Sequence, residues 1–152
     1  MATMSDDERD AFLSERRLGT LAIGRVGKAP LMAPIWYRYN VGGTIDIAMG
    51  ADSAKTKRLR AEGRASMCVI EEGLPYKYVT VEGPIVIEAL QGKQAEAEIL
   101  EISTRYLGRK GGAHYTENFM KNLSSDNLHD QHGTEEVLVR ITPEYWRTEV
   151  LR

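Results

Sequence analysis

The sequence predicts a mainly β barrel of the Greek-key or meander type, in an α+β chain with a few capping helices. About seven segments alternate apolar and polar residues with a period of two, and most follow one another through short turns. Only three or four segments have the periodicity of a helix. Strands that form adjacent hairpins around few helices favour a closed antiparallel barrel. The length of 152 residues suits one domain over residues 1–152.

The N-terminal part of the chain predicts one helix followed by three strands. A helix over residues 5–17 begins well, because Ser5 can cap it and the acidic residues that follow suit the first turn. The alternation then predicts strands over residues 18–26, 29–40 and 44–50. Pro34 lies inside the second of these strands, and proline cannot donate to a sheet ladder, so we expect an edge strand or a bulge there. The alternative is a backbone shaped to leave groups free for a ligand.

The C-terminal part predicts further helices and the remaining strands. A helix over residues 52–62 ends at Gly63, and a second helix over residues 91–107 carries one apolar stripe. The residues of this stripe are Ala95, Ile99, Ile102 and Tyr106. Residues 114–123 are a further candidate helix, and residues 124–134 a loop. The predicted strands cover residues 64–71, 75–89, 135–142 and 144–151, with a bend or bulge at Gly83-Pro84.

The composition argues against several classes of protein. The net charge of −2 does not indicate a strongly basic nucleic-acid binder. No run of 18 apolar residues exists, so no membrane-spanning helix is expected, and the acidic N-terminus lacks the apolar core of a signal peptide. Cys68 is the one cysteine, so the fold cannot depend on an intramolecular disulfide. We therefore expect a cytoplasmic protein with no nucleic-acid partner and no membrane partner.

Positive charge is concentrated in residues 52–64, which hold five basic and two acidic side chains, a local charge of +3. Ser53 is the candidate N-cap of this helix, and the first N–H groups beyond it have no partners within the helix. Lys55 and Lys57 lie at this end, where the helix dipole disfavours cations by a few tenths of a kcal/mol each. A bound anion would reverse that cost, because helix N-termini bind phosphate. The alternatives are a solvated helix face and a nucleic-acid contact, and one short helix in a chain with two tryptophans argues against the second.

Several motifs resemble those of a known superfamily. The stretch "SAKTKRL" follows "VGGTIDIAMG" and precedes "RASMCVIE", and this order is similar to that of the pyridoxamine-phosphate-oxidase-like split β-barrels. More narrowly it resembles their flavin/deazaflavin-dependent oxidoreductases, whose stretch is typically Ser-x-Lys-x-x-Asn-Leu. Arg58 stands here in place of that Asn. The segments "LGTLAIGRVGKAPLMAPIWYRY", "PYKYVTVEG", "RYLG" and "VLVRITPEYWR" extend the resemblance over nearly the whole chain.

The resemblance implies a split β-barrel that forms a homodimer, with two cofactor sites at the dimer interface. It implies that the cofactor phosphate is bound by Ser53, Lys55, Thr56, Lys57 and Arg58. It places the cofactor ring against Ala33, Pro34, Ile35 and Trp36 and near Met49, Gly50 and Ala51. Trp36 is expected to wall the pocket or, equally, to pack in the core.

The resemblance also implies an F-420-dependent reductase, in which the reduced deazaflavin gives a hydride to an electrophilic small molecule. FMN ends in one phosphate, whereas coenzyme F-420 carries a phosphodiester and a tail with several carboxylates. The basic residues beyond the phosphate site favour F-420; they are Lys57, Arg58, Arg60 and Arg64. The alternatives are an FMN-dependent pyridoxamine-phosphate-oxidase-like oxidoreductase and a non-catalytic carrier of flavin, deazaflavin or haem. The sequence names neither the substrate nor a catalytic residue.

Three aromatic residues are candidates for the substrate pocket: Tyr37, Tyr78 and Trp146. Tyr37, Tyr78 and also Tyr76 are candidate proton donors, although a tyrosine on a strand more commonly packs half-buried. Trp146, with Arg147, is a candidate to reach the site of a partner subunit.

The remaining sequence features give weaker indications of function. The glycine-rich residues 108–112 predict a flexible loop, which either covers the site or simply connects two helices. His129 and His132 have a spacing that suits a metal on a helix, but they lie in a predicted loop without further Cys or His nearby. We therefore expect no metal site.

Overall fold

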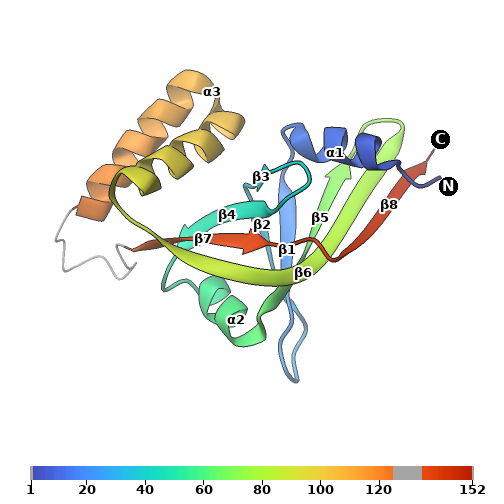
Figure 1. Ribbon diagram of the computed structural model, residues 1–152, viewed down its shortest axis with the longest axis horizontal. Helices are drawn as coiled ribbons and strands as arrows, with labels where there is room; N and C mark the ends of the chain where they lie inside the picture. The colour runs from blue at the N-terminus through green and yellow to red at the C-terminus, as the bar shows by residue number, and fades with distance from the viewer. Residues whose placement is uncertain (1, 125–134, 152) are drawn as a thin grey trace.

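The computed structural model describes residues 2–124 and 135–151, in which eight antiparallel strands form one curled sheet. The order of the strands is β2-β1-β5-β6-β7-β4-β3, and β8 pairs with β6. Figure 1 shows this half-barrel with three helices around it, so the predicted α+β barrel class is confirmed. The strands are β1 (Gly19–Ile23), β2 (Leu31–Ile35), β3 (Arg38–Tyr39), β4 (Ile45–Gly50), β5 (Arg64–Glu71), β6 (Tyr76–Leu90), β7 (Glu136–Ile141) and β8 (Tyr145–Leu151). The helices are α1 (Asp6–Ser14), α2 (Ala54–Glu62) and α3 (Gly92–Ser124).

The long strand β6 connects the parts of the sheet. Its first half pairs with β5 and β8, and its second half pairs with β7. The change of partner from β8 to β7 occurs at Gly83-Pro84, where the sequence predicted a bend or bulge. The chain between β7 and β8 bonds to β6 on both sides of this point, with Thr142 N–H donating to Pro84 O at 3.0 Å. A Cβ atom at Gly83 would overlap the Thr142 carbonyl, so the close approach requires glycine.

The predicted strand over residues 29–40 is in fact two strands. β2 pairs with β1 and β3 pairs with β4, and these two short strands stand at opposite ends of the strand order. Only Trp36 and Tyr37 connect them, so this link brings the two edges of the sheet together. Pro34 lies on the edge strand β2, as predicted, where its missing N–H costs no ladder bond.

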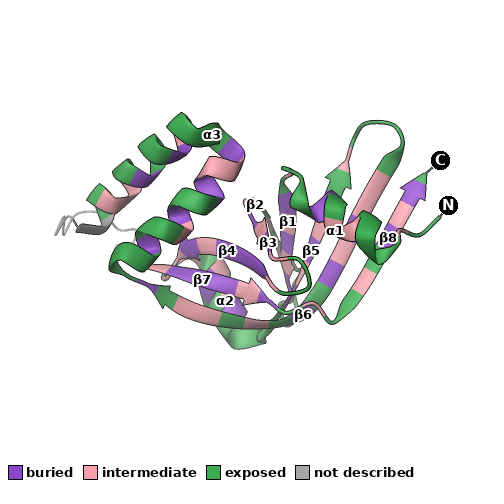
Figure 2. Cartoon of the chain, turned by 45° about the horizontal axis from the view of Figure 1, so that its top comes forward, coloured by how far each residue is buried: buried purple, intermediate pink, exposed green. Residues whose placement is uncertain are grey.

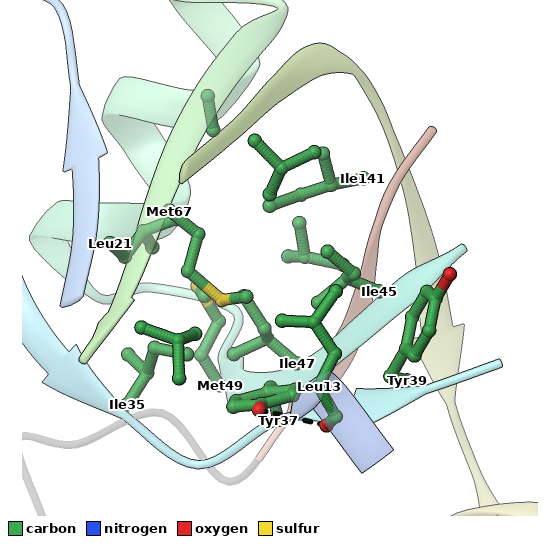
Figure 3. Packing of buried hydrophobic residues seen from close by; sticks show 14 of the residues in the cluster. Leu13, Leu21, Ile35, Tyr37, Tyr39, Ile45, Ile47, Met49, Met67 and Ile141 are labelled. Atoms are coloured by element: carbon green, nitrogen blue, oxygen red, sulfur yellow. Dashed lines mark hydrogen bonds between the residues drawn. The ribbon is translucent and has the colours of Figure 1, made fainter. Parts of the chain in front are cut away.

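The interior of the half-barrel is a buried apolar cluster (Figure 3). The residues labelled there are Leu13, Leu21, Ile35, Tyr37, Tyr39, Ile45, Ile47, Met49, Met67 and Ile141. Each such side chain contributes roughly 1.5–3 kcal/mol when it is fully buried. The helix α1 closes one end of the cluster, and its N-terminus has the predicted cap, with Ser5 and Glu8 forming a capping box. The helix ends at Ser14 rather than at residue 17.

A helical hairpin replaces the predicted helix–loop–helix over residues 91–123. The chain reverses at Gly108 alone, which has φ 78°, and residues 109–112 are helical rather than a loop. Gly112 packs so closely on Thr104 that a Cβ would not fit. The Ser103 hydroxyl contacts the Thr116 hydroxyl at 3.2 Å and Gly112 O at 3.2 Å, and these bonds join the two arms.

The first arm of α3 packs on the sheet through its apolar stripe. All four predicted stripe residues are buried, and three of them form a second cluster with Leu90 and Leu138. Figure 2 shows the buried positions of α3 on the side that faces β4 and β7. Arg38 adds ion pairs to Glu98 at 2.6 Å and Glu101 at 2.8 Å, which tie the same arm to the sheet.

No helix within the described residues is long and apolar enough to cross a membrane. The two ends of the described chain lie together, because Ala2 forms a bridge with Val150 of β8 (Figure 1). The predicted loop over residues 124–134 begins inside α3 at Ser124, and its other residues lie outside the described part.

Candidate functional site

A cavity of about 490 Å³ lies between the sheet and the helical hairpin α3. This volume is within the range of roughly 300–1,000 Å³ typical of pockets for small molecules and cofactors. Its lining is mostly apolar, with a few polar residues contributed by α2, α3 and β7. The lining residues are Leu18, Pro34, Ile35, Trp36, Ala48, Met49, Gly50, Lys55, Ile99, Ile102, Ser103, Tyr115, Phe119 and Glu136.

The cavity exists because small residues occupy one face of β4. Antiparallel pairing with β7 places Gly50 opposite Glu136 and Ala48 opposite Leu138, and directly paired residues share a face of the sheet. Leu138 packs against α3, whereas Gly50 has no side chain to fill the space beside it. The gap therefore opens at the Gly50 end of the strand, next to the start of α2.

The N-terminus of α2 lies next to this end of β4. Ser53 is the N-cap, as predicted, and its Oγ accepts the N–H of Thr56 at 3.2 Å. The Thr56 hydroxyl donates to Gly50 O at 2.6 Å, so the helix start is bonded to the end of β4. Among the described residues, no acceptor takes the N–H groups of Ala54 and Lys55. Lys55 lines the cavity, and Ala54, with the other open N–H group, directly precedes it.

Carboxylates partly neutralise the other basic side chains of residues 52–64. Arg58 pairs with Glu62 one turn later at 3.2 Å, and Arg64 pairs with Glu144 at 3.2 Å. Three basic side chains of this segment have no ion-pair partner within residues 2–124 and 135–151, and they are Lys55, Lys57 and Arg60. Lys57 and Arg60 are exposed, and neither lines the cavity.

Trp36 forms a fixed wall of the cavity. Its ring stacks on that of Tyr106 with 5.1 Å between centroids and 6° between planes, and Tyr115 lies against it at 5.4 Å. Tyr106 is itself held, because its hydroxyl donates to Arg17 O at 2.7 Å and accepts Tyr37 N–H at 3.0 Å. The indole is therefore packed between both arms of α3 and still presents part of its surface to the cavity.

Glu136 is a polar cavity residue that the sequence did not single out. It begins β7, and its Oε1 lies 3.9 Å from the position that a Cβ of Gly50 would occupy. Burial raises the pKa of the Glu136 carboxyl to about 7. Burial also raises the pKa of the nearby Tyr115, and the charge of Glu136 adds to that shift. A carboxyl group in a largely apolar cavity with such a pKa is a candidate acid–base group.

Six of the twelve expected cofactor residues line the cavity: Pro34, Ile35, Trp36, Met49, Gly50 and Lys55. Ala33 and Ala51 are next to lining residues but do not line it themselves, and Ser53 and Thr56 hold the helix start. The residues from α3 were missed as site residues, although Ile99 and Ile102 belong to the predicted apolar stripe. An acidic residue at the first position of a buried strand, as in "EEVLVRI", is the signal that could have indicated Glu136.

The three expected substrate-pocket residues lie elsewhere in this chain. Tyr37 has no exposed surface, and its hydroxyl donates to Leu13 O at 2.9 Å (Figure 3). Burial raises the pKa of Tyr37 to about 12, so Tyr37 belongs to the core and not to the cavity wall. Tyr78 and Trp146 line a separate groove of about 420 Å³ on the sheet of β5, β6 and β8, together with Arg147.

Within the described residues, no group of three His, Cys, Asp or Glu side chains could hold a metal ion. His129 and His132 lie outside the described residues. Cys68 is half-buried, and burial raises the pKa of its thiol, which suits a small apolar residue better than a nucleophile.

Comparison with known proteins identifies the fold. No family model matches the chain, and no curated protein matches it. A conserved hypothetical protein of Mycobacterium tuberculosis, Rv2991, is similar in structure with a TM-score of 0.73 and 24% identity, over 98% of this chain and 86% of that one. An F420 reductase is similar with a TM-score of 0.66 and 19% identity, over 91% and 94% of the two chains. A putative pyridoxamine 5'-phosphate oxidase from Listeria innocua is similar with a TM-score of 0.57 and 18% identity, over 96% and 97%.

These likenesses show that the chain has a split β-barrel fold. At identities below 25% they show the fold alone.

We expect Glu136→Gln to stabilise the protein by about 1–3 kcal/mol near pH 8 and to leave its stability unchanged below about pH 4. The folded pKa of about 7 exceeds the roughly 4.3 of an unfolded glutamate, so the folded state binds the proton more tightly. Stability of the natural protein should thus fall as pH rises between these two values, because the unfolded chain releases the proton to water while the folded one keeps it. Glutamine stays neutral throughout.

Urea unfolding of both proteins across this pH range measures the effect. Glu135→Gln is the matched control, because Glu135 is the exposed neighbour, and it should show no pH-dependent difference. Equal stability of the Glu136→Gln variant and the natural protein near pH 8 would contradict a buried carboxyl.

Proposed function

We propose that this chain is an F-420-dependent reductase, which transfers a hydride from the reduced deazaflavin to an electrophilic small molecule. The observation that supports the proposal best is that an apolar cavity lies next to a helix N-terminus with a positively charged side chain. Lys55 and the open N–H groups of Ala54 and Lys55 suit an anion, and the walls formed by Pro34, Trp36 and Ile102 suit a planar ring. The names of two structures with the same fold, an F420 reductase and a putative pyridoxamine 5'-phosphate oxidase, support the same class of chemistry.

In this proposal the residues of the chain bind and orient the cofactor, which supplies the hydride chemistry. Lys55 and the two N–H groups hold its phosphate directly. Ser53 and Thr56 act indirectly, because Ser53 caps α2 and the Thr56 hydroxyl bonds to Gly50 O. Trp36, fixed by its stacking on Tyr106, provides a flat wall and excludes water from one side.

The choice between F-420 and FMN rests on charge beyond the phosphate. Arg58 and Arg64 are engaged by carboxylates, so fewer basic groups are free than the sequence suggests. Lys57 and Arg60 are exposed on the same helix and can attract the carboxylate tail of F-420. FMN needs only the charge at Lys55, and FMN-dependent oxidoreduction is therefore the second candidate function.

We further propose a homodimer in which the groove at Tyr78 and Trp146 meets a second copy of the chain. Tyr145 and Arg147 also line this groove, and the exposed Ile70 of β5 pairs with Tyr78. Sedimentation equilibrium at micromolar concentration should therefore give twice the chain mass. Tyr145→Glu should shift the species toward the monomer, whereas Val26→Glu, at the exposed tip between β1 and β2, should not. A monomeric natural protein would rule out the dimer.

Titration of the purified protein with F-420 and, separately, with FMN tests the cofactor. We expect F-420 to bind with micromolar or tighter affinity and FMN to bind more weakly, as followed by cofactor fluorescence. Tight FMN binding would favour the second candidate. Binding of neither would leave α2 as a solvated basic helix and refute both. Oxidation of reduced cofactor above background by added acceptors then separates an enzyme from a carrier.

Lys55→Ala should weaken cofactor binding by roughly 1.5–3 kcal/mol, the scale of a hydrogen bond to a charged group, which is about 10- to 150-fold in affinity. The loss should shrink as salt rises, since part of it is screened Coulomb attraction. Lys93→Ala is the control, because Lys93 is an exposed lysine at the start of α3 that does not line the cavity. Unchanged binding in the Lys55→Ala variant would remove Lys55 from the site.

A further inference from the structure

We propose that Glu136 is the proton donor of this site: its carboxyl group gives the proton that completes reduction of the substrate. The inference rests on the proposed function, because it assigns a second step to the same cavity. The sequence suggested Tyr37, Tyr76 and Tyr78 for this role, and none of the three lines the cavity.

The position of Glu136 in the cavity suits a proton donor. It lines the cavity at the open end of the β4–β7 face, opposite Gly50, where no side chain covers it from the neighbouring strand. The cavity is also lined by Trp36 and Ile102, so a cofactor ring held against these walls would share the cavity with the Glu136 carboxyl. A substrate bound in the same cavity would then have access to both.

The expected protonation state of the Glu136 carboxyl also suits a proton donor. Burial raises the pKa of Glu136 to about 7, so a large fraction of the carboxyl groups carry a proton near neutral pH. Two other titratable residues of the described chain line the same cavity, Lys55 from α2 and Tyr115 from α3. The strands packed on either side contribute Gly50 and Leu90, which carry no charge. An anion bound at Lys55 would offset the lysine charge and further favour the protonated carboxyl.

The other hydroxyl groups near the cavity are poorer donors. Ser103 already bonds within α3, to Gly112 O and the Thr116 hydroxyl. Burial raises the pKa of Tyr115 above the ordinary tyrosine value, and the charge of Glu136 raises it further. Tyr37 is enclosed in the core and bonded to Leu13 O. With Lys55 assigned to the anion, Glu136 is the described cavity residue best suited to give a proton near neutral pH.

Reduced deazaflavin or flavin, when bound, would supply a hydride to the electrophilic carbon of the substrate, losing two electrons, and would release its remaining ring proton to water. As the new C–H bond forms, the π electron pair of the substrate double bond moves to the neighbouring atom. That atom takes the proton from the Glu136 carboxyl and leaves a carboxylate. Water then returns a proton to Glu136 before the next turnover.

Turnover of Glu136→Gln as a function of pH tests the role. The natural protein should lose kcat as pH rises above about 7, since the donor is then ionised. The Glu136→Gln variant should bind cofactor within about threefold of the natural protein, lose kcat by about 100-fold or more near neutral pH, and lack that pH limb. Glu136→Asp, which keeps an acid, should recover part of the activity, and Glu135→Gln should behave like the natural protein. Unchanged kcat in Glu136→Gln, with active natural protein, would overturn the proposal.

A readout independent of turnover is the titration of the Glu136 side-chain carboxyl, followed by carbon-13 NMR in the protein without substrate. The midpoint should lie near 7 and should rise when F-420 or FMN is added. A midpoint at the ordinary glutamate value would overturn the proposal, because the group would be ionised at neutral pH. Weakened cofactor binding with an unchanged kcat would make Glu136 a cofactor ligand instead. A natural protein that binds cofactor but never oxidises it would refute the proposed function, and with it this step.

Discussion

The buried carboxylate of Asp46 is the interaction on which the cavity depends, because it fixes the helical hairpin that forms one wall. Asp46 has no exposed surface and pairs with Arg38 at 2.6 Å and Arg140 at 3.1 Å. Burial alone would raise the pKa of Asp46, but hydrogen bonds from Arg38, Thr44 and Asn40 and the charge of Arg140 outweigh it and hold the pKa below its ordinary value. Arg38 then reaches two glutamates of α3. Removing one partner of a buried pair typically costs about 3–5 kcal/mol, so Asp46 holds Arg38 firmly in the position from which it reaches α3.

From Asp46 the same face of β4 runs through Ala48 to Gly50, and its character changes along the way. At Asp46 the face is charged, and at Ala48 it is apolar, where Leu138 of β7 packs against α3. At Gly50 nothing projects, and the space between sheet and helix remains open. One strand thus anchors the hairpin at one end and leaves room for a ligand at the other. Because Thr56 bonds to Gly50 O, the same strand end also fixes the start of α2.

Local rules sufficed for some of this arrangement and failed where a partner is distant in sequence. The Ser53 cap, the edge position of Pro34 and the stripe on α3 each follow from residues within a few positions. The split of residues 29–40 does not, because Ile35, Tyr37 and Tyr39 keep one parity and are all buried while the pairing partner changes from β1 to β4. The place of Glu136 in the site could not be predicted for a similar reason. Its pairing partner, Gly50, is distant in the sequence, and only their pairing shows that the carboxyl lies at a cavity.

The cavity holds both a cation and a carboxyl group, and their balance links binding to chemistry in the proposed function. An ionised Glu136 would offset the charge of Lys55 and weaken the attraction for a phosphate at the start of α2. Burial keeps a large share of Glu136 neutral near pH 7, so Lys55 stays available to an anion while the carboxyl keeps its proton. Loss of that proton at higher pH removes the donor and reduces the positive charge of the site at the same time. In the proposed function, the charge state of one carboxyl would thereby influence both cofactor affinity and proton delivery.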